Sequence, residues 1–305
     1  RWFAATPNDD EAFIAAALAT LPDAPRDVPH VLLLGPSSMR EGVTSGPDVA
    51  ARLARATGGE VRVVELMGDN QAIEQSGALA ARLPADVPGI VVIGITLYGL
   101  GHDPAMAPLV ARRPRFGVAL PDLDAELALQ GEPPRPPTGI PLLDDPGFYL
   151  RRLPYMPMNV LTGGTVRQRH RYRDQRPMRP EELPFYAPDA TDWPGLQERL
   201  DAHGPGRIAV MGRVAERIRA RGHVPVFVAG PRTRIAPDDP ATVAQYDALL
   251  QQARDEYGVE VWQLEEAELL PSDFVDVVHL RTATGSERFT AALSARLVPR
   301  LPRRR

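Results

Sequence analysis

The stretch Val31-Leu32-Leu33-Leu34-Gly35-Pro36-Ser37-Ser38 decides how this chain folds. Four consecutive apolar residues that end at a Gly-Pro pair are typical of a strand buried on both faces, as in a parallel sheet. A helix expected over 47–56 ends at Gly58-Gly59, and a second apolar strand is expected over 61–66. The chain therefore starts as an alternation of strands and helices.

The same alternation continues toward the end of the chain. Further strands are expected over 90–95, 224–228 and 259–264, and further helices over 10–21, 71–83, 194–202, 207–221, 242–257 and 286–297. Pro225 fits inside the fourth strand only where it makes no ladder hydrogen bond. The pattern predicts an α/β fold with a doubly wound, five-stranded parallel sheet. Ligands of such sheets bind beyond the carboxyl ends of the strands.

Residues 113–194 interrupt this alternation. The segment is rich in proline, arginine and aromatic residues, and it contains a proline-rich stretch at 133–137 and a basic run at 167–173 that includes His170. This composition favours an insertion or lid. We divide the chain into an N-terminal helical extension at 1–27, a main domain formed by 28–112 and 195–305, and the insertion at 113–194.

Composition narrows the functional classes. With 44% hydrophobic and 24% charged residues, the chain resembles an ordinary globular protein. Its net charge of −4 argues against general nucleic-acid binding. The absence of cysteine excludes disulfides, thiolate zinc sites and cysteine nucleophiles. No apolar run is long enough to span a membrane, and the start at Arg1 leaves both a removed signal or anchor and a trimmed start open.

Two motifs at opposite ends of the chain offer the parts of an activated-serine site. Ser37 follows the first strand, and Asp276 stands three residues before His279. A serine hydroxyl becomes a nucleophile when a base takes its proton, and a carboxylate can orient that base. The second glycine of the nucleophile elbow of α/β-hydrolases is missing, so a different fold is expected. The alternative is that the serine caps a helix and that Asp-x-x-His is a surface turn or half of a metal site.

The strand ends also carry candidate groups for substrate. Donors to a developing oxyanion are expected from the backbone N–H of Ser37, the backbone N–H of Gly68 and the hydroxyl of Thr96. Further candidates for substrate contact are Ser38, Arg40, Asn70 and His102.

These blocks resemble the SGNH/GDSL hydrolase superfamily. Gly35-Pro36-Ser37 is similar to its Gly-x-Ser first block, and Gly68 to the glycine of its second block. Gly94-Ile95-Thr96 is similar to the Gly-x-Asn third block, although threonine stands where the family has asparagine. Asp276 and His279 match the Asp-x-x-His block. The resemblance covers residues 28–112 and 205–298.

The resemblance implies a flavodoxin-like SGNH fold and acyl transfer through an acyl-Ser37 intermediate, with neither cofactor nor metal. Divergent members of the family resemble extracytoplasmic O-acetyltransferases of bacterial polysaccharides. This implies an acyl donor, a carbohydrate-like acceptor, a membrane acyl-carrying partner protein and a periplasmic or membrane-anchored location. A cytoplasmic location stays open, and no nucleic-acid partner is expected. The alternative functions are a carboxylesterase or lipase-like hydrolase, a non-catalytic glycan-binding module and, with too few ligands, a metal hydrolase.

Overall fold

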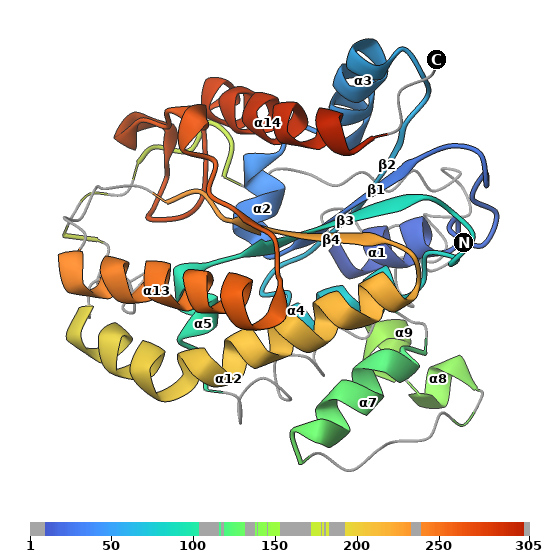
Figure 1. The fold of residues 1–305 in the computed structure, drawn as a ribbon, viewed down its shortest axis with the longest axis horizontal. Coiled ribbons are helices and arrows are strands. Elements are labelled where there is room, and N and C mark those ends of the chain that lie inside the picture. Colours follow the sequence, from blue (N-terminus) through green and yellow to red (C-terminus); the bar gives the residue numbers. More distant parts are fainter. Residues whose placement is uncertain are drawn as a thin grey trace.

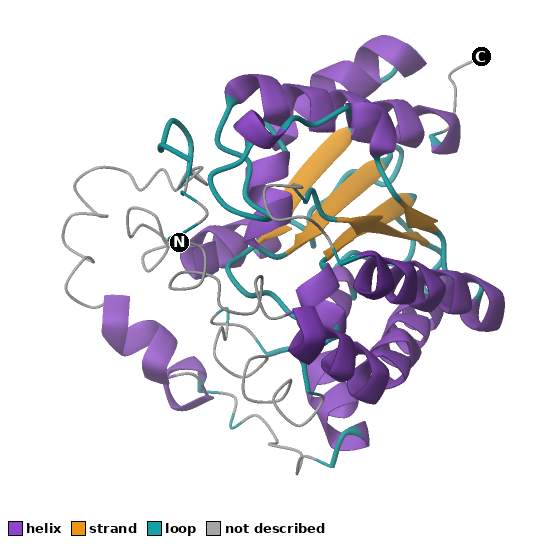
Figure 2. Cartoon of the chain, turned by 90° about the vertical axis from the view of Figure 1, so that its left-hand side faces the viewer, coloured by secondary structure: helices purple, strands orange, loops and turns teal. Residues whose placement is uncertain are grey.

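The computed structural model describes residues 10–103, 116, 119–131, 138, 140–144, 146–152, 172–177, 179, 181–182, 193–232 and 239–301. They form a five-stranded parallel sheet in the order β2-β1-β3-β4-β5, with helices on both faces (Figures 1 and 2). The strands are β1 (His30–Gly35), β2 (Arg62–Met67), β3 (Gly89–Ile95), β4 (Val224–Ala229) and β5 (Val261–Trp262). The predicted doubly wound α/β fold is confirmed.

The chain changes direction across the sheet at β1. The first crossover leads from β1 to β2 on one side, and the next leads back past β1 to β3 on the other side. His30 pairs with Arg62 of β2 and with Gly89 of β3, so the three strands begin level with one another. The carboxyl ends of β1 and β3 therefore border the crevice where sheets of this kind bind ligands.

Alternate residues of β1 bury their side chains on opposite faces of the sheet. Leu32 and Leu34 belong to one hydrophobic cluster, and Val31 and Leu33 to the other. The first face is covered by α1 (Asp10–Leu18), α4 (Ile73–Ala80), α12 (Trp193–Ala220) and α13 (Pro240–Tyr257). The second face is covered by α2 (Ser37–Gly42), α3 (Gly46–Thr57) and α14 (Ala283–Leu297). Burial on both faces explains why β1 is apolar throughout.

One predicted break in the helices is wrong. The sequence predicted two helices over 194–202 and 207–221, whereas α12 runs unbroken through Gly204 and Pro205. The side chain of Leu249 in α13 lies so close to Gly204 that an added Cβ would be 2.5 Å from Leu249 Cδ1. Packing of α12 against α13 therefore outweighs the backbone hydrogen bond that proline cannot make.

The edge strand is shorter than predicted. β5 is limited to Val261 and Trp262, which pair with Phe227 and Val228, rather than extending over 259–264. β5 is an edge strand with β4 as its one neighbour, so β5 extends only as far as its residues pair with β4. Pro225 lies opposite Val91 of β3 but precedes Phe227 and Val228, the residues of β4 that pair with β5. The N–H of Phe227, two residues later, donates toward β5 to the carbonyl of Glu260, so the missing N–H of Pro225 falls on the side of β4 that has no strand partner at this position.

Several other element ends differ by a few residues. Helix α1 ends at Leu18 instead of 21, and α4 spans Ile73–Ala80 instead of 71–83. The remaining elements are α5 (Leu97–Leu100), α7 (Pro121–Leu129), α8 (Pro141–Asp144), α9 (Pro146–Arg152), η3 (Glu265–Ala267), η4 (Pro271–Asp273) and η5 (Val298–Arg300).

The predicted insertion is described only in part. Helix α7 packs on the main body, where Glu126 is fully buried and pairs with Arg213 and Arg217 of α12. The proline-rich stretch at 133–137 and His170 lie outside the described residues. No helix in the described part of the chain has both the length and the apolar character needed to cross a bilayer.

We predict that Gly35→Ala strongly destabilises the fold. Gly35 has φ +130°, and an added Cβ would lie 2.9 Å from the Gly94 backbone of the neighbouring strand. Backbone strain and overpacking together cost about 3 kcal/mol of unfolding free energy, measurable by urea denaturation. Gly58→Ala is the matched control, because Gly58 also has positive φ but has open space around it. We expect a loss of about 1 kcal/mol there. Equal losses at the two positions would contradict the close packing of β1 on β3.

Candidate active site

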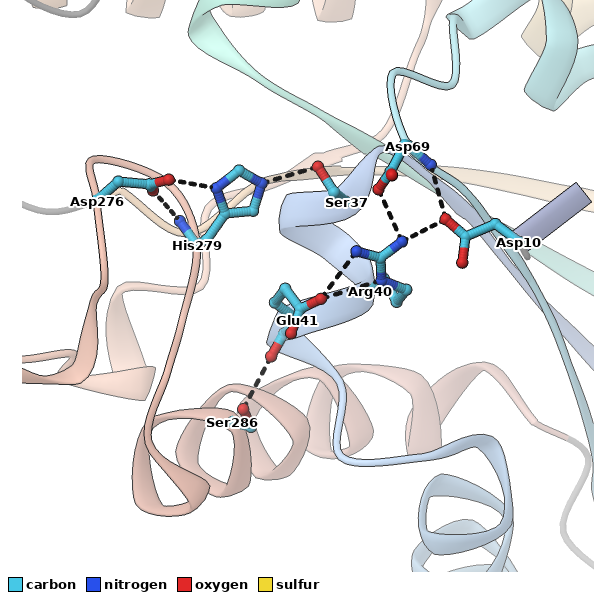
Figure 3. A network of polar contacts seen from close by, with 8 residues as sticks. All are labelled: Asp10, Ser37, Arg40, Glu41, Asp69, Asp276, His279 and Ser286. Atoms are coloured by element: carbon cyan, nitrogen blue, oxygen red, sulfur yellow. Dashed lines mark hydrogen bonds and ion pairs between the residues drawn. The ribbon is translucent and has the colours of Figure 1, made fainter. Parts of the chain in front are cut away.

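Ser37, His279 and Asp276 form a continuous hydrogen-bonded chain (Figure 3). The Ser37 hydroxyl oxygen lies 2.8 Å from Nε2 of His279, and Nδ1 of the same ring lies 2.7 Å from a carboxylate oxygen of Asp276. The serine and the histidine are 242 residues apart in the sequence. The structure thus brings together the three residues that the two sequence motifs had singled out.

The end of β1 positions the serine. Gly35 closes the strand, Pro36 is the N-cap of α2, and Ser37 is the first residue of that helix. Ser37 remains partly exposed, whereas the helix residues after it are buried. Ser37 therefore stands at the carboxyl end of β1, at the sheet edge where ligands of such folds bind.

A tight loop between η4 and α14 holds the acid and the base. An antiparallel bridge joins Phe274 to Leu280, and the N–H of Val275 donates to the carbonyl of His279. Inside this loop, one Asp276 oxygen accepts from the backbone N–H groups of Val278 and His279, at 2.9 and 2.8 Å. The other oxygen faces the imidazole, so a single carboxylate orders both the loop and the ring.

The environment of Asp276 keeps this carboxyl ionised. Burial raises its pKa, but hydrogen bonds from the His279 ring and from two backbone N–H groups outweigh burial and lower the pKa overall. An ionised carboxylate can only accept hydrogen bonds, so the proton lies on Nδ1 of His279. Nε2 is then an acceptor for the Ser37 hydroxyl, as general-base catalysis requires.

Tyr172 covers the imidazole, and sequence reasoning missed it. Its ring stacks on His279 with a centroid distance of 4.3 Å and an interplanar angle of 24°. Two hydrogen bonds tie the segment that carries Tyr172 to the end of the loop between η4 and α14. The N–H of Asp174 donates to the carbonyl of Arg281 at 3.0 Å, and the Arg281 guanidinium donates to the carbonyl of Gln175 at 2.8 Å. In the sequence, Tyr172 is an aromatic residue inside the basic run at 167–173. Its position along the chain gave no indication that it would lie against His279.

Of the three predicted oxyanion donors, Gly68 has its N–H engaged elsewhere. The N–H of Gly68 donates to the carbonyl of Gly35 at 3.0 Å, so it prolongs the ladder between β1 and β2, and the prediction for Gly68 is wrong. The hydroxyl oxygen of Thr96 accepts from the N–H of Gly99 and caps α5. As the first residue of α2, Ser37 has an N–H without an acceptor inside the helix.

Of the four predicted substrate contacts, two are buried and two are exposed. Ser38 is 2% exposed, and its hydroxyl has no hydrogen-bond partner among the described residues. Arg40 is 2% exposed and is bound to carboxylates of the protein itself, so the roles predicted for both residues are wrong. Asn70 is exposed in the loop after β2, with φ 50°. His102 is exposed after α5.

Arg40 instead builds a buried ionic network beneath the nucleophile. Its guanidinium pairs with Asp10 of α1, with the adjacent Glu41 and with Asp69 after β2 (Figure 3). Asp10 also accepts from the backbone N–H of Asp69 at 3.2 Å. Burial lowers the pKa of Arg40, but the three carboxylates outweigh burial and raise it overall, so the guanidinium stays charged. The network fixes α2, and with it Ser37, against α1 and β2.

Comparison with known proteins assigns no family. No protein-family model matches the chain, and no curated protein matches it. In the described part of the chain, no group of three or more histidine, cysteine, aspartate or glutamate side chains is arranged to hold a metal ion. The chemistry of the site is therefore inferred from its geometry and from the resemblance of its motifs.

We predict that Arg40→Met destabilises the protein rather than weakening a substrate contact. The change leaves the carboxylates of Asp10 and Glu41 buried without their cation and costs about 3 kcal/mol of unfolding free energy. Thermal and urea unfolding measure this loss. Arg52→Met is the control, because Arg52 pairs with Asp48 and Glu287 near the surface, and a loss under about 1 kcal/mol is expected. Wild-type stability of Arg40→Met would contradict the structural role.

Proposed function

We propose that this protein is a serine-dependent acyltransferase or esterase that works through an acyl-Ser37 intermediate. The observation that carries the proposal is the relay from Ser37 to His279 to Asp276, with hydrogen bonds of 2.8 and 2.7 Å. The resemblance of the motifs to SGNH hydrolases supports the same chemistry. The transferred group is proposed to be acetyl, and the acceptor a carbohydrate hydroxyl or water.

In this proposal, Nε2 of His279 carries the proton both when Ser37 is acylated and when it is deacylated. Nε2 of His279 takes the hydroxyl proton as the Ser37 oxygen bonds to the acyl carbon, giving a tetrahedral oxyanion. The bond to the leaving oxygen then breaks, and Nε2 returns the proton to that oxygen, which leaves Ser37 acylated. In the second half, Nε2 takes a proton from the acceptor hydroxyl or from water as its oxygen bonds to the acyl carbon. The ester bond between the acyl carbon and the Ser37 oxygen then breaks, and Nε2 gives the proton to the released Ser37 oxygen. Asp276 stabilises the imidazolium in both halves.

The oxyanion needs donors at the strand ends. The backbone N–H of Ser37 is the first candidate, because it opens α2 and has no acceptor within the helix. The hydroxyl of Thr96 is the second, since its oxygen accepts a hydrogen bond in the cap of α5 and its proton is not used there. Gly68 is not part of this proposal.

Tyr172 is proposed as a positioning residue for the base. A ring stacked on the imidazole limits rotation of His279 away from Ser37 and keeps water from one face of the ring. Burial and the nearby carboxylate of Asp276 raise the pKa of Tyr172, so the phenol stays neutral near pH 7. Its contribution therefore comes from the flat ring and not from a charge.

Transferase and esterase share these residues and differ in the acceptor. A saccharide that diverts acyl groups from water would identify the transferase. The resemblance to polysaccharide O-acetyltransferases favours the transferase, together with an extracytoplasmic site of action and a membrane acyl-carrying partner. A non-catalytic glycan-binding module would have no need of an ordered serine–histidine–aspartate relay, so the observed geometry favours an enzyme.

We predict that Ser37→Ala abolishes acyl transfer. Hydrolysis of p-nitrophenyl acetate should fall roughly a thousandfold or more, and the acetyl adduct seen by intact-mass spectrometry of the wild type should disappear. Ser38→Ala is the matched control, because it removes the neighbouring buried hydroxyl and leaves the relay intact. Undiminished hydrolysis by a folded Ser37→Ala protein would refute the proposed nucleophile.

We predict that the ring of Tyr172 matters and its hydroxyl does not. Tyr172→Ala should lower kcat about tenfold with little change in KM, since a base that samples other orientations is less often in reach of Ser37. Tyr172→Phe keeps the stacked ring and should retain most of the activity. The rate of labelling by a fluorophosphonate probe should follow kcat in both variants. Equal activity in Tyr172→Ala and the wild type would show that the stacking is incidental.

A further inference from the structure

A pocket of about 550 Å³ lies at the carboxyl ends of β3, β4 and β5. It borders the loop between η4 and α14 that carries Asp276 and His279, which we call the catalytic loop. Its lining includes Thr96 after β3, Arg232 after β4 and Gln263 after β5. Val277 and Val278 also line it, and these are the two residues between Asp276 and His279. One wall of the pocket is therefore the loop that holds the catalytic base.

The size of the pocket excludes a small acyl group as its sole occupant. Pockets of about 300–1,000 Å³ enclose ligands with the size of a sugar unit or a drug molecule. An acetyl group would fill only a small part of such a volume. The acceptor of the proposed reaction is the reactant that matches the space.

Arg232 supplies an unused hydrogen-bond donor in this pocket. Its Nη1 atom is buried and has no hydrogen-bond partner among the described residues. The guanidinium carbon lies 5.8 Å from the centroid of the Tyr246 ring, and that buried ring has no charge with which to pair the arginine. A buried charged donor without an acceptor is unfavourable, and a bound anion would relieve this cost.

The other charged residues of the described lining limit the charge of that anion. They are Glu265 and Glu268, both exposed to solvent, and neither forms an ion pair with Arg232. Two carboxylates on the wall of the same pocket make a dianion such as a phosphate monoester less favourable there than a monoanion. A planar carboxylate carries one charge and matches the paired N–H groups of the guanidinium.

We propose that this pocket binds a carboxylate-bearing sugar, a hexuronic acid unit, with its carboxylate on Arg232. As an acyl acceptor, that sugar would present its hydroxyl groups beside the catalytic loop. The choice of a sugar and its acceptor role rest on the proposed function, whereas the binding of a carboxylate by Arg232 does not.

The test measures binding without turnover. Trigalacturonate and its methyl ester are titrated by calorimetry into Ser37→Ala protein and into the wild type. The ester has nearly the same shape and lacks the charges, so the comparison isolates the carboxylate. We expect trigalacturonate to bind at least tenfold more tightly than the ester, and Arg232→Gln to abolish that preference. Arg55→Gln is the control, because it removes the same charge from an exposed position on α3, a helix that contributes no residue to the described lining of the pocket.

The outcomes separate this inference from the proposed enzyme activity. Equal affinity of the folded wild type for trigalacturonate and its methyl ester overturns the inference without the use of any variant. Retention of the preference in Arg232→Gln overturns it as well, as does equally tight binding of galactose 6-phosphate and galacturonate. Tight, Arg232-dependent binding in a protein whose Ser37 proves inert would uphold the binding site and reject the acyl-transfer role.

Discussion

A guanidinium buried beneath α2 holds together the elements that position Ser37, the proposed nucleophile. Arg40 sits between carboxylates from α1, from α2 itself and from the loop after β2. A buried cation of this kind is tolerated only while all its partners stay in place. The position of Ser37 therefore depends on α1, an element that precedes the first strand and has no chemistry of its own. The hydroxyl of Ser286 also donates to the carbonyl of Glu41, which ties α14 to the same helix.

The loop that carries Asp276 and His279 is ordered by a second and more local constraint. One carboxylate oxygen of Asp276 fixes the backbone of the loop, and the other fixes the imidazole. Asp276 and His279 are thus placed mostly by residues near them in sequence, whereas Ser37 is placed by the sheet. The relay forms where these two independently ordered parts meet, beside the crevice at β1 and β3.

Much of this arrangement could be predicted from short patterns. The apolar strands, the helix after Ser45 and the Asp-x-x-His spacing are local features, and each has a physical meaning that needs no distant contact. The errors occur where a distant contact decides. Gly204 and Pro205 predict a helix break from the sequence alone, but Leu249 packs beside Gly204 and the helix continues. Gly68 was predicted to donate to the oxyanion, but its N–H donates to the carbonyl of Gly35 instead.

The sequence by itself determined the fold class and the three residues of the relay, because strand periodicity and the motif spacing depend on neighbours along the chain. Only the tertiary structure decided which polar groups remain available for chemistry. Arg40 became a structural cation, Gly68 became part of a ladder, and Tyr172 came to lie on the imidazole. These roles depend on burial and on partners far away in sequence, and a hydrogen-bonding group has no fixed role until its partner is known.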